Sequence, residues 1–338
     1  MSEQVVIGID GGGTRLRAAI VSCAGELLGL GEGGSGNYHD VGANQVRTNI
    51  SEAVSQAWAA FDNTPREVAA IFLGLGSIVT REDQEAIREI VTELALVPAD
   101  SIGVDHDLRV ALMGGLAGET GIVLIAGTGS SCYGRDKHGN SWQSGGWGPS
   151  LDDPGSSFWL GRMAMIAAIR DYDGRGEATR LRDGVVDALE LSDIRHILRR
   201  VELQGMTRSE VAALGRLVTE SAAIGDSVAC QIIQEGSEEL AKMVAAVAGN
   251  LASNNESTLP IPVVVTGGLT AARQVFMNPL TQSLRRIAPT TILKETFLPP
   301  VLGAALLAME LAGERLSPSV VNKLEAEYSA IKHVCSVR

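Results

Sequence analysis

The pattern of apolar and polar residues predicts a strand-rich opening that recurs later in the chain. Residues 5–10 are β-branched and apolar, a glycine-rich break follows at 11–14, and a second apolar run covers 16–21 before a turn at 23–26. This spacing predicts a meander of three strands rather than a strand–helix unit. A strand, a Gly/Thr/Ser break and another strand follow one another again over 121–134. The recurrence indicates an internal duplication, with a domain boundary near residues 116–120.

Periodicity and chain-breaking residues predict the remaining elements. Apolar residues at four-residue spacing, from Val46 to Trp58, predict an amphipathic helix over 44–60. The other expected elements are strands at 69–76, 101–107 and 262–266, helices at 82–96 and from 108, a mostly helical region over 158–253, an apolar helix from 299 and a charged helix after 317. Together they predict an α/β protein.

Composition and charge narrow the class of protein. The 338 residues suggest two domains, and the 45% hydrophobic content is enough for a sizeable core. The net charge of −12 disfavours nucleic acid and anionic membranes as partners, and the apolar runs are too short to span a bilayer. The cysteines lie far apart without a zinc-ligand spacing, which indicates reduced thiols: Cys23, Cys132, Cys230 and Cys335. We therefore expect a soluble, cytoplasmic protein.

Glycine is the unusual component, with 39 residues against an aromatic content of 4%. Three strand ends run directly into glycines, at 10–14, 127–130 and 266–268. Successive backbone N–H groups in such turns form a concave site for anions, and neighbouring Thr and Ser hydroxyls add donors. Neither the Walker pattern nor a GxGxxG motif within a βαβ unit is present. We interpret the three junctions as phosphate-facing loops; a plain hairpin turn is the alternative for any single one.

Two carboxylate positions carry candidate chemistry. Asp10 ends an apolar strand beside the first glycine loop, which indicates Mg²⁺ bound through water; an Asx-type turn is the alternative. Strand alternation places Asp105 and Asp107 on one face and His106 on the other. Asp107 also precedes a predicted helix, so an N-cap is its alternative role. As a catalytic group it would accept the proton of a hydroxyl that attacks ATP.

A third candidate site combines a glycine loop with acids. Trp147 stands among glycines in residues 144–148, and two acids precede a further turn in residues 152–156. Close backbone approach and carboxylate acceptors suit the binding of a polyol such as a sugar. A surface loop with an anchoring tryptophan is the alternative.

Taken together, the motifs resemble a known family. Asp-Gly-Gly-Gly-Thr at 10–14, Gly-Thr-Gly-Ser at 127–130, Gly-Gly-Trp-Gly at 145–148 and Asp-x-Gly-Ser at 153–156 resemble the N-acetylglucosamine kinase branch of the BadF/BadG/BcrA/BcrD ATPase family. This family belongs to the actin–hexokinase–Hsp70 superfamily. The resemblance implies two RNase H-like domains, 1–117 and 118–338, that flank an ATP cleft, with a helical segment at about 158–253 in the second domain.

The resemblance also implies roles for individual residues. Asp107 falls on the catalytic aspartate, which favours it over Asp105, and Asp10 would lie near Mg²⁺. Phosphate or nucleotide contacts would come from Asp10, Gly11, Gly12, Gly13, Thr14, Arg15, Gly127, Thr128, Gly129, Gly215, Gly267 and Gly268. Sugar contacts would come from Asn37, Asp107, Ser130, Ser131, Gly146, Trp147, Gly148 and Asp153. The implied ligands are ATP and an amino sugar, and the implied assembly is a homodimer.

Departures from the family pattern surround the expected sugar site. The usual Gly-Asp-Glu-Gly-Ser reads Asp152-Asp153-Pro154-Gly155-Ser156, Arg15 replaces a frequent lysine, and Pro149 and Ser150 replace a histidine and an apolar residue. The expected activity is phosphorylation of the 6-hydroxyl of N-acetylglucosamine or a close amino sugar. Glucosamine or N-acetylmuramate as substrate are alternatives. Another class is an ATPase activator of a CoA-ester dehydratase or reductase, which would need clustered cysteines, and a third is a non-catalytic ATP or sugar sensor.

Overall fold

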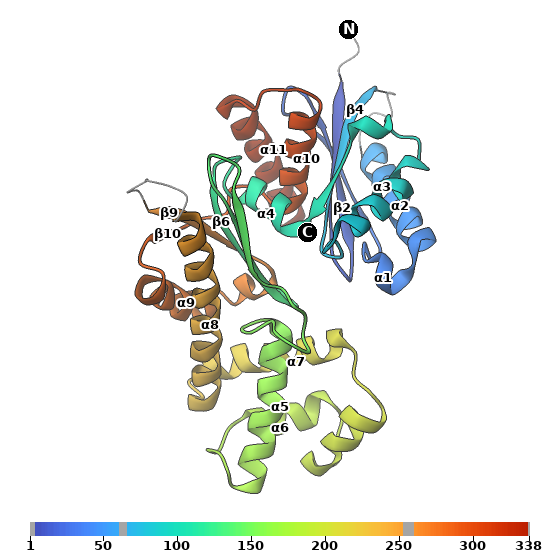
Figure 1. Cartoon of the computed structure of the whole chain (residues 1–338). Helices are drawn as coiled ribbons and strands as arrows, with labels where there is room; N and C mark the ends of the chain where they lie inside the picture. Colours follow the sequence, from blue (N-terminus) through green and yellow to red (C-terminus); the bar gives the residue numbers. More distant parts are fainter. Residues whose placement is uncertain (1–3, 61–65, 253–259, 337–338) are drawn as a thin grey trace. The chain divides into compact units, whose positions relative to one another are not determined.

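The chain forms two compact units, each built around a five-stranded mixed sheet (Figure 1). The computed structural model describes residues 4–60, 66–252 and 260–336. One unit comprises Met1–Thr120 together with Glu295–Arg338, and the other comprises Gly121–Lys294. Within the described residues, no helix is both long and apolar enough to span a bilayer.

The first sheet has the strand order β3-β2-β1-β4-β5. Its strands are β1 (Val5–Gly11), β2 (Leu16–Ser22), β3 (Leu27–Gly33), β4 (Val68–Leu75) and β5 (Ile102–His106). The first three strands form the predicted antiparallel meander, β4 runs parallel to β1, and β5 runs parallel to β4. Gly11 pairs with Leu16, so the glycine loop at 12–15 is the turn between β1 and β2.

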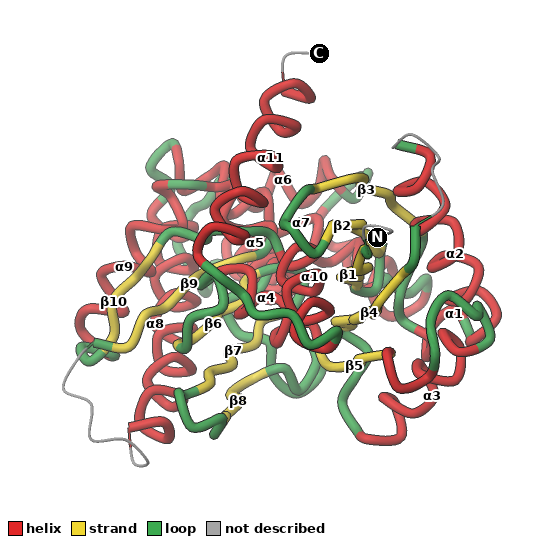
Figure 2. The backbone as a smooth tube through the Cα atoms, turned by 90° about the horizontal axis from the view of Figure 1, so that it is seen from above, coloured by secondary structure: helices red, strands yellow, loops and turns green. Residues whose placement is uncertain are grey.

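The second sheet repeats this arrangement. Its strands are β6 (Gly121–Ala126), β7 (Ser130–Arg135), β8 (Ser141–Gly145), β9 (Ile261–Thr266) and β10 (Thr291–Lys294), in the order β10-β9-β6-β7-β8 (Figure 2). Again three strands form an antiparallel meander and two more continue in parallel from the first of them. The predicted duplication and the α/β class are therefore confirmed.

Helices cover both faces of the first sheet. They are α1 (Tyr38–Val41), α2 (Ala43–Ala59), α3 (Arg81–Thr92), α4 (Asp107–Gly115), α10 (Pro300–Leu311) and α11 (Pro318–Ser336), with a short 3₁₀ turn at Ala99–Ser101. Ile7 and Ile9 point into the core beneath α2 and α3, whereas Val6 points into the core beneath α10. Glycines allow close packing on both faces. A Cβ at Gly31 would lie 2.0 Å from the Ala53 carbonyl oxygen in α2, and one at Gly8 would lie 2.2 Å from the Ala305 nitrogen in α10.

The C-terminal segment, residues 295–338, lies in the first unit. The division expected at residue 117 places all of 118–338 in the second domain. In the structure, α10 lies against β1 and β4, and its apolar side chains share a core with Val6, Val21 and Ala70. The reason is that these residues line the face of the first sheet opposite α2, and that face needs its own apolar cover.

The second unit carries the predicted helical region. Its helices are α5 (Ser157–Asp173), α6 (Leu181–Ala188), α7 (Arg208–Ala223), α8 (Ser227–Ala252) and α9 (Gln274–Ile287), with 3₁₀ turns at Ile194–His196 and Gly268–Ala272 and a π-helical turn at Arg199–Leu203. The helix α8 packs on β6, β7 and β8. Helices α5 and α7 cross closely at Gly161, which has no side chain. A Cβ there would lie 1.9 Å from the Val211 carbonyl oxygen, so only glycine fits.

Candidate active-site residues

The first glycine loop presents unused backbone donors. The Gly12 N–H donates to the Arg15 carbonyl at 3.0 Å, which closes the turn, and the Gly36 N–H donates to the Gly12 carbonyl at 3.0 Å. Gly13 and Thr14 are exposed, and within the described residues their N–H groups have no hydrogen-bond partner. Backbone N–H groups that project from a turn in this way can bind an anion such as phosphate.

Asp10 and Asp107 form the electrostatic centre of the first unit. Burial raises the pKa of Asp10 to about 7, and the negative charge of Asp107 adds to this effect, while Arg17 and Arg15 oppose it. Burial likewise raises the pKa of Asp107, against the opposing charge of His106. A carboxylate whose ionisation is disfavoured by a neighbouring carboxylate favours a nearby cation or a bound proton.

The expected strand alternation of Asp105 and Asp107 is wrong. Strand β5 ends at His106, and Asp107 is the first residue of α4. The cap of α4 is His106, whose Nδ1 accepts the Arg109 N–H at 3.1 Å, and Asp105 is paired with Arg109 at 3.4 Å. Asp107 is therefore not the N-cap, although the backbone N–H groups of Asp107 and Leu108 lie close enough to lower the pKa of its carboxyl against the effect of burial.

The carboxylate of Asp107 lies beside the end of β1. A Cβ at Gly76 would lie 3.0 Å from Asp107 Oδ2, and the Gly76 N–H donates to the Gly11 carbonyl at 2.9 Å. Glycine at position 76 thus lets the β4–α3 loop pass between Asp107 and the glycine loop.

Asn37 lies next to the same glycine loop. Its Oδ1 accepts the His39 N–H at 3.1 Å, which makes it the N-cap of α1, and its Nδ2 donates to Asp40 Oδ2 at 2.6 Å. That Asp40 oxygen is 4.0 Å from the Cβ position of Gly13. The side-chain amide of Asn37 keeps one N–H and one lone pair for a ligand hydroxyl.

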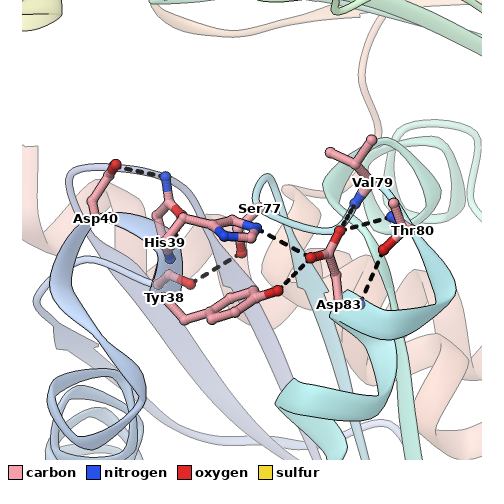
Figure 3. Close-up of polar contacts among 9 residues, drawn as sticks. Tyr38, His39, Asp40, Ser77, Val79, Thr80 and Asp83 are labelled. Atoms are coloured by element: carbon pink, nitrogen blue, oxygen red, sulfur yellow. Dashed lines mark hydrogen bonds and ion pairs between the residues drawn. The ribbon is translucent and has the colours of Figure 1, made fainter.

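A buried carboxylate that the sequence reasoning missed holds this segment. Asp83 accepts hydrogen bonds from the N–H groups of Val79 and Thr80, from the Tyr38 hydroxyl and from His39 Nε2 at 3.1 Å (Figure 3). Burial raises the pKa of Asp83, but these hydrogen bonds outweigh it and hold that pKa well below its usual range. The same contact raises the pKa of Tyr38 to about 12. The capping-box spacing of Thr80 and Asp83 was the available signal.

In the second unit, the two remaining glycine junctions lie side by side. A Cβ at Gly267 would lie 2.4 Å from the Ala126 carbonyl oxygen, and Gly267 has φ +109°, a conformation that favours glycine. The loop after β6 closes with the Gly127 N–H donating to the Gly129 carbonyl at 3.0 Å. The first amides of α5 donate back to this loop, from Ser157 to Gly127 at 2.8 Å and from Phe158 to Thr128 at 3.2 Å. Thr128 is exposed at the tip.

Gly215 lies behind this loop rather than in it. It is buried within α7, where a Cβ would lie 2.5 Å from the Ser157 carbonyl oxygen. Its direct role in the structure is to allow the close crossing of α7 and α5.

The predicted sugar loop is an exposed turn built on glycine. Gly145, Gly146 and Gly148 all have positive φ, and Trp147 is 75% exposed. Ser131 Oγ accepts from Gln143 Nε2 at 3.2 Å directly beneath Gly146. A pocket of about 460 Å³ adjoins the loop, lined by Ser144, Gly145, Trp147, Leu151, Asp152, Pro154, Glu239, Lys242 and Met243.

Two expected sugar contacts, Ser130 and Asp153, have internal partners. The Ser130 hydroxyl donates to the Pro154 carbonyl at 2.8 Å. Asp153 is 2% exposed, has φ +61°, and accepts from Arg208 Nη2 at 2.8 Å. Burial raises the pKa of Asp153, and Arg208 partly offsets that rise. The sequence reasoning missed Arg208, because 55 positions separate it from Asp153.

The donor set fits a magnesium ion bound mainly by substrate. Among the described residues, no group of three or more His, Cys, Asp or Glu side chains could hold a metal. Mg²⁺ bound with nucleotides typically takes one or two carboxylates and otherwise phosphate oxygens and water. A single carboxylate such as that of Asp10, beside the unused N–H groups of the glycine loop, agrees with this mode.

Comparisons with known proteins agree with the fold and the motifs. An N-acetylmuramic acid/N-acetylglucosamine kinase of Clostridium acetobutylicum is 33% identical over 254 residues, which cover 75% of this chain and 82% of that protein. An N-acetyl-D-glucosamine kinase of Dictyostelium discoideum is 29% identical over 318 residues, which cover 91% of this chain and 99% of that protein. A crystal structure assigned as an N-acetylglucosamine kinase of Chromobacterium violaceum has a TM-score of 0.71 and 25% identity, and the match covers 91% of this chain and 100% of that one.

The family match extends over most of the chain. Residues 7–308 match the BadF/BadG/BcrA/BcrD ATPase family. The glycine loops, Asp107 and the Gly-Gly-Trp-Gly turn all lie within these residues. This chain therefore belongs to the BadF/BadG/BcrA/BcrD ATPase family.

Proposed function

We propose that this protein is an ATP-dependent amino-sugar kinase that phosphorylates the 6-hydroxyl of N-acetylglucosamine or a close relative. The observation that carries the proposal is the carboxylate of Asp107, which follows the N-cap His106 and lies beside Gly76 and the end of β1, where the glycine loop begins. The names of the relatives from Clostridium and Dictyostelium support the choice of substrate class.

In the proposed reaction, Asp107 acts as the general base. The sugar O6 attacks the γ-phosphorus of ATP, the bond between that phosphorus and the β–γ bridging oxygen breaks, and the hydroxyl proton passes to Asp107. The exposed N–H groups of Gly13 and Thr14 bind phosphate oxygens, as do the N–H groups of Thr128 and Gly129 in the second glycine loop. Bound Mg²⁺ near Asp10 would neutralise phosphate charge.

The sugar contacts in this proposal come from Asn37, from Ser131 and from the Gly146–Gly148 turn. Ser130 and Asp153 support that turn from behind. Asp152 adds a carboxylate to the pocket beside Trp147. A negative charge there favours neutral N-acetylglucosamine or cationic glucosamine over anionic N-acetylmuramate.

A cytoplasmic location and a homodimer complete the proposal. The acidic chain has no cysteine spacing typical of a disulfide framework, which supports a reducing compartment. The homodimer follows the family resemblance, and sedimentation analysis of the purified protein tests it.

The test of substrate class is an ADP-release assay with Mg²⁺–ATP. The panel contains N-acetylglucosamine, glucosamine, N-acetylmannosamine, N-acetylmuramate and glucose. We expect the highest kcat/KM with N-acetylglucosamine or glucosamine and a lower value with N-acetylmuramate. Absence of turnover with every sugar would refute the kinase proposal.

A further inference from the structure

Asp83 is a buried carboxylate with no part in the proposed chemistry. It is 6% exposed and lies at the start of α3, where Thr80 and Asp83 form a capping box. In a capping box, the carboxylate at the third helical position needs only a backbone N–H as its partner. Asp83 in addition accepts the Tyr38 hydroxyl and His39 Nε2, both from α1 (Figure 3).

The helix α1 is short, and it packs against the core of the first unit through the Tyr38 ring. It has 4 residues, none of them buried. A helix this short is not stable by its own hydrogen bonds. The ring centroids of Tyr38 and His39 are 4.0 Å apart and both side chains contact Asp83, so they attach α1 to α3.

The residues before α1 contact the candidate active site directly. Gly36 donates to Gly12 in the glycine loop at 3.0 Å, and its carbonyl oxygen lies 3.4 Å from the Ser77 hydroxyl. Ser77 follows Gly76, which lies against Asp107. The loop at 76–80 is therefore bounded by the candidate base at one end and by the contacts of Asp83 at the other.

We propose that Asp83 is a positioning residue, which through Tyr38 and His39 holds α1 so that the Asn37 amide is oriented toward the amino sugar. This inference rests on the proposed function, since Asn37 is the sugar contact assigned there. Asp83 itself touches neither sugar nor nucleotide in this scheme. Loss of the contact therefore weakens sugar binding and leaves ATP binding and the transfer step nearly unchanged.

The decisive variant is Tyr38→Phe, which removes one hydroxyl and keeps the ring and the capping box. The hydroxyl of Tyr38 donates to a charged carboxylate, and such a hydrogen bond contributes substantially to the stability of the local structure. Its loss should loosen α1 and raise the sugar KM by about three- to tenfold. The KM for ATP should stay within about twofold. The matched control is Thr80→Ala, which removes the side-chain cap of α3 and the Thr80 hydroxyl beside Asp83 but leaves Tyr38 and His39 in contact with Asp83. It should leave the sugar KM unchanged.

Hydrogen exchange gives a readout that does not depend on activity. The amides of Asp40, Val41 and Gly42 donate within α1. They should exchange faster in Tyr38→Phe but not in Thr80→Ala. Unchanged exchange in Tyr38→Phe would overturn the attachment of α1, and faster exchange with an unchanged sugar KM would overturn the positioning of Asn37. If the unsubstituted protein phosphorylates no amino sugar, the proposed function fails and with it the role of Asn37, while exchange still decides whether Asp83 holds α1.

Discussion

Arg208 and Asp153 form a partly buried ion pair behind the proposed sugar loop. Arg208 Nη2 lies 2.8 Å from Asp153 Oδ2, and the two side chains are 49% and 2% exposed. Both also lie against Gly129, where a Cβ would be 2.4 Å from Arg208 Nη2 and 2.7 Å from Asp153 Oδ2. The pair thus connects the start of α7, the turn at 152–156 and the second glycine loop.

Removal of this cation should destabilise the protein in a pH-dependent way. Arg208→Ala leaves the buried carboxylate of Asp153 without its partner, which costs about 1–3 kcal/mol at pH 8, less than for a fully buried pair because Arg208 is half exposed. Burial already raises the pKa of Asp153, and loss of Arg208 raises it further. Stability then falls as the pH rises through that pKa, so urea unfolding should show a smaller loss at pH 5 than at pH 8.

The matched control on the same helix is Arg216→Ala. Arg216 pairs with Glu220 at 2.5 Å, but both side chains are exposed. Its loss should change the free energy of unfolding by less than about 0.5 kcal/mol. Equal effects of the two substitutions, or an Arg208→Ala effect that is independent of pH, would contradict the assigned role of the pair.

A methyl group at residue 76 should displace the candidate base. The Cβ of Gly76→Ala would lie 3.0 Å from Asp107 Oδ2, so the carboxylate or the loop must shift by a few tenths of an ångström. Small misplacements of reacting groups cost on the order of tenfold to a hundredfold in rate. We expect a lower kcat with an unchanged KM for ATP. Gly184→Ala in α6, where the added Cβ would make an ordinary contact of 3.4 Å with the Leu217 side chain, should keep full activity. A fully active Gly76→Ala would count against the placement of Asp107.

The partly buried carboxylate of Asp107 should cost stability at neutral pH. Its pKa is raised by burial in the folded protein, so the folded state binds a proton more tightly than the unfolded state. Stability associated with this group is therefore present at low pH and is lost as the pH rises through the raised pKa. Asp107→Asn should raise the Tm at pH 8 and leave it unchanged near pH 4. Thermal unfolding at both pH values checks this, and a lower Tm at pH 8 would argue against the sign of the shift.

The division into two compact units predicts which fragments of the chain should fold on their own. The fragment 121–294 contains its whole sheet and core, so it should unfold cooperatively on its own. The fragment 1–120 lacks α10, which covers Val6, Val21 and Ala70. It should remain unfolded or aggregate unless 295–338 is joined to it. Circular dichroism with urea unfolding decides, and cooperative folding of 1–120 alone would contradict this division.

The fold was largely predictable from the sequence because its signals are local. Apolar runs separated by glycine breaks predicted the first meander and the first two strands of the second, but not β8. Four-residue spacing predicted α2, which spans Ala43–Ala59. The packing of the last helices was not predictable, since the run from Pro300 is apolar on every side and does not indicate which sheet it covers. Many glycines were assigned to turns, whereas Gly8 and Gly31 serve close packing of helices on the sheet.

The candidate site was predictable only in part. Motifs predicted the glycine loops and Asp107. The sequence did not predict that β5 ends at His106, because the alternation of Asp105 and Asp107 suggested a longer strand and histidine is not a usual N-cap residue. The roles of Asp83 and Arg208 were not predicted, because Tyr38 is 45 positions from Asp83 and Asp153 is 55 positions from Arg208. Neither contact has a periodic signature, and only the folded chain brings these side chains together.

The central claim is that Asp107 is the base of an amino-sugar kinase, and one side-by-side measurement tests it most directly. The unsubstituted protein and Asp107→Asn are given Mg²⁺–ATP and N-acetylglucosamine, sugar phosphate is quantified over time, and ATP affinity is measured on the same samples. We predict 6-phosphorylated sugar from the unsubstituted protein, a rate lower by about 10²–10⁴ in the variant, and an ATP Kd within about twofold. Near-equal rates in the two proteins, or no sugar phosphate from the unsubstituted one, would contradict the account.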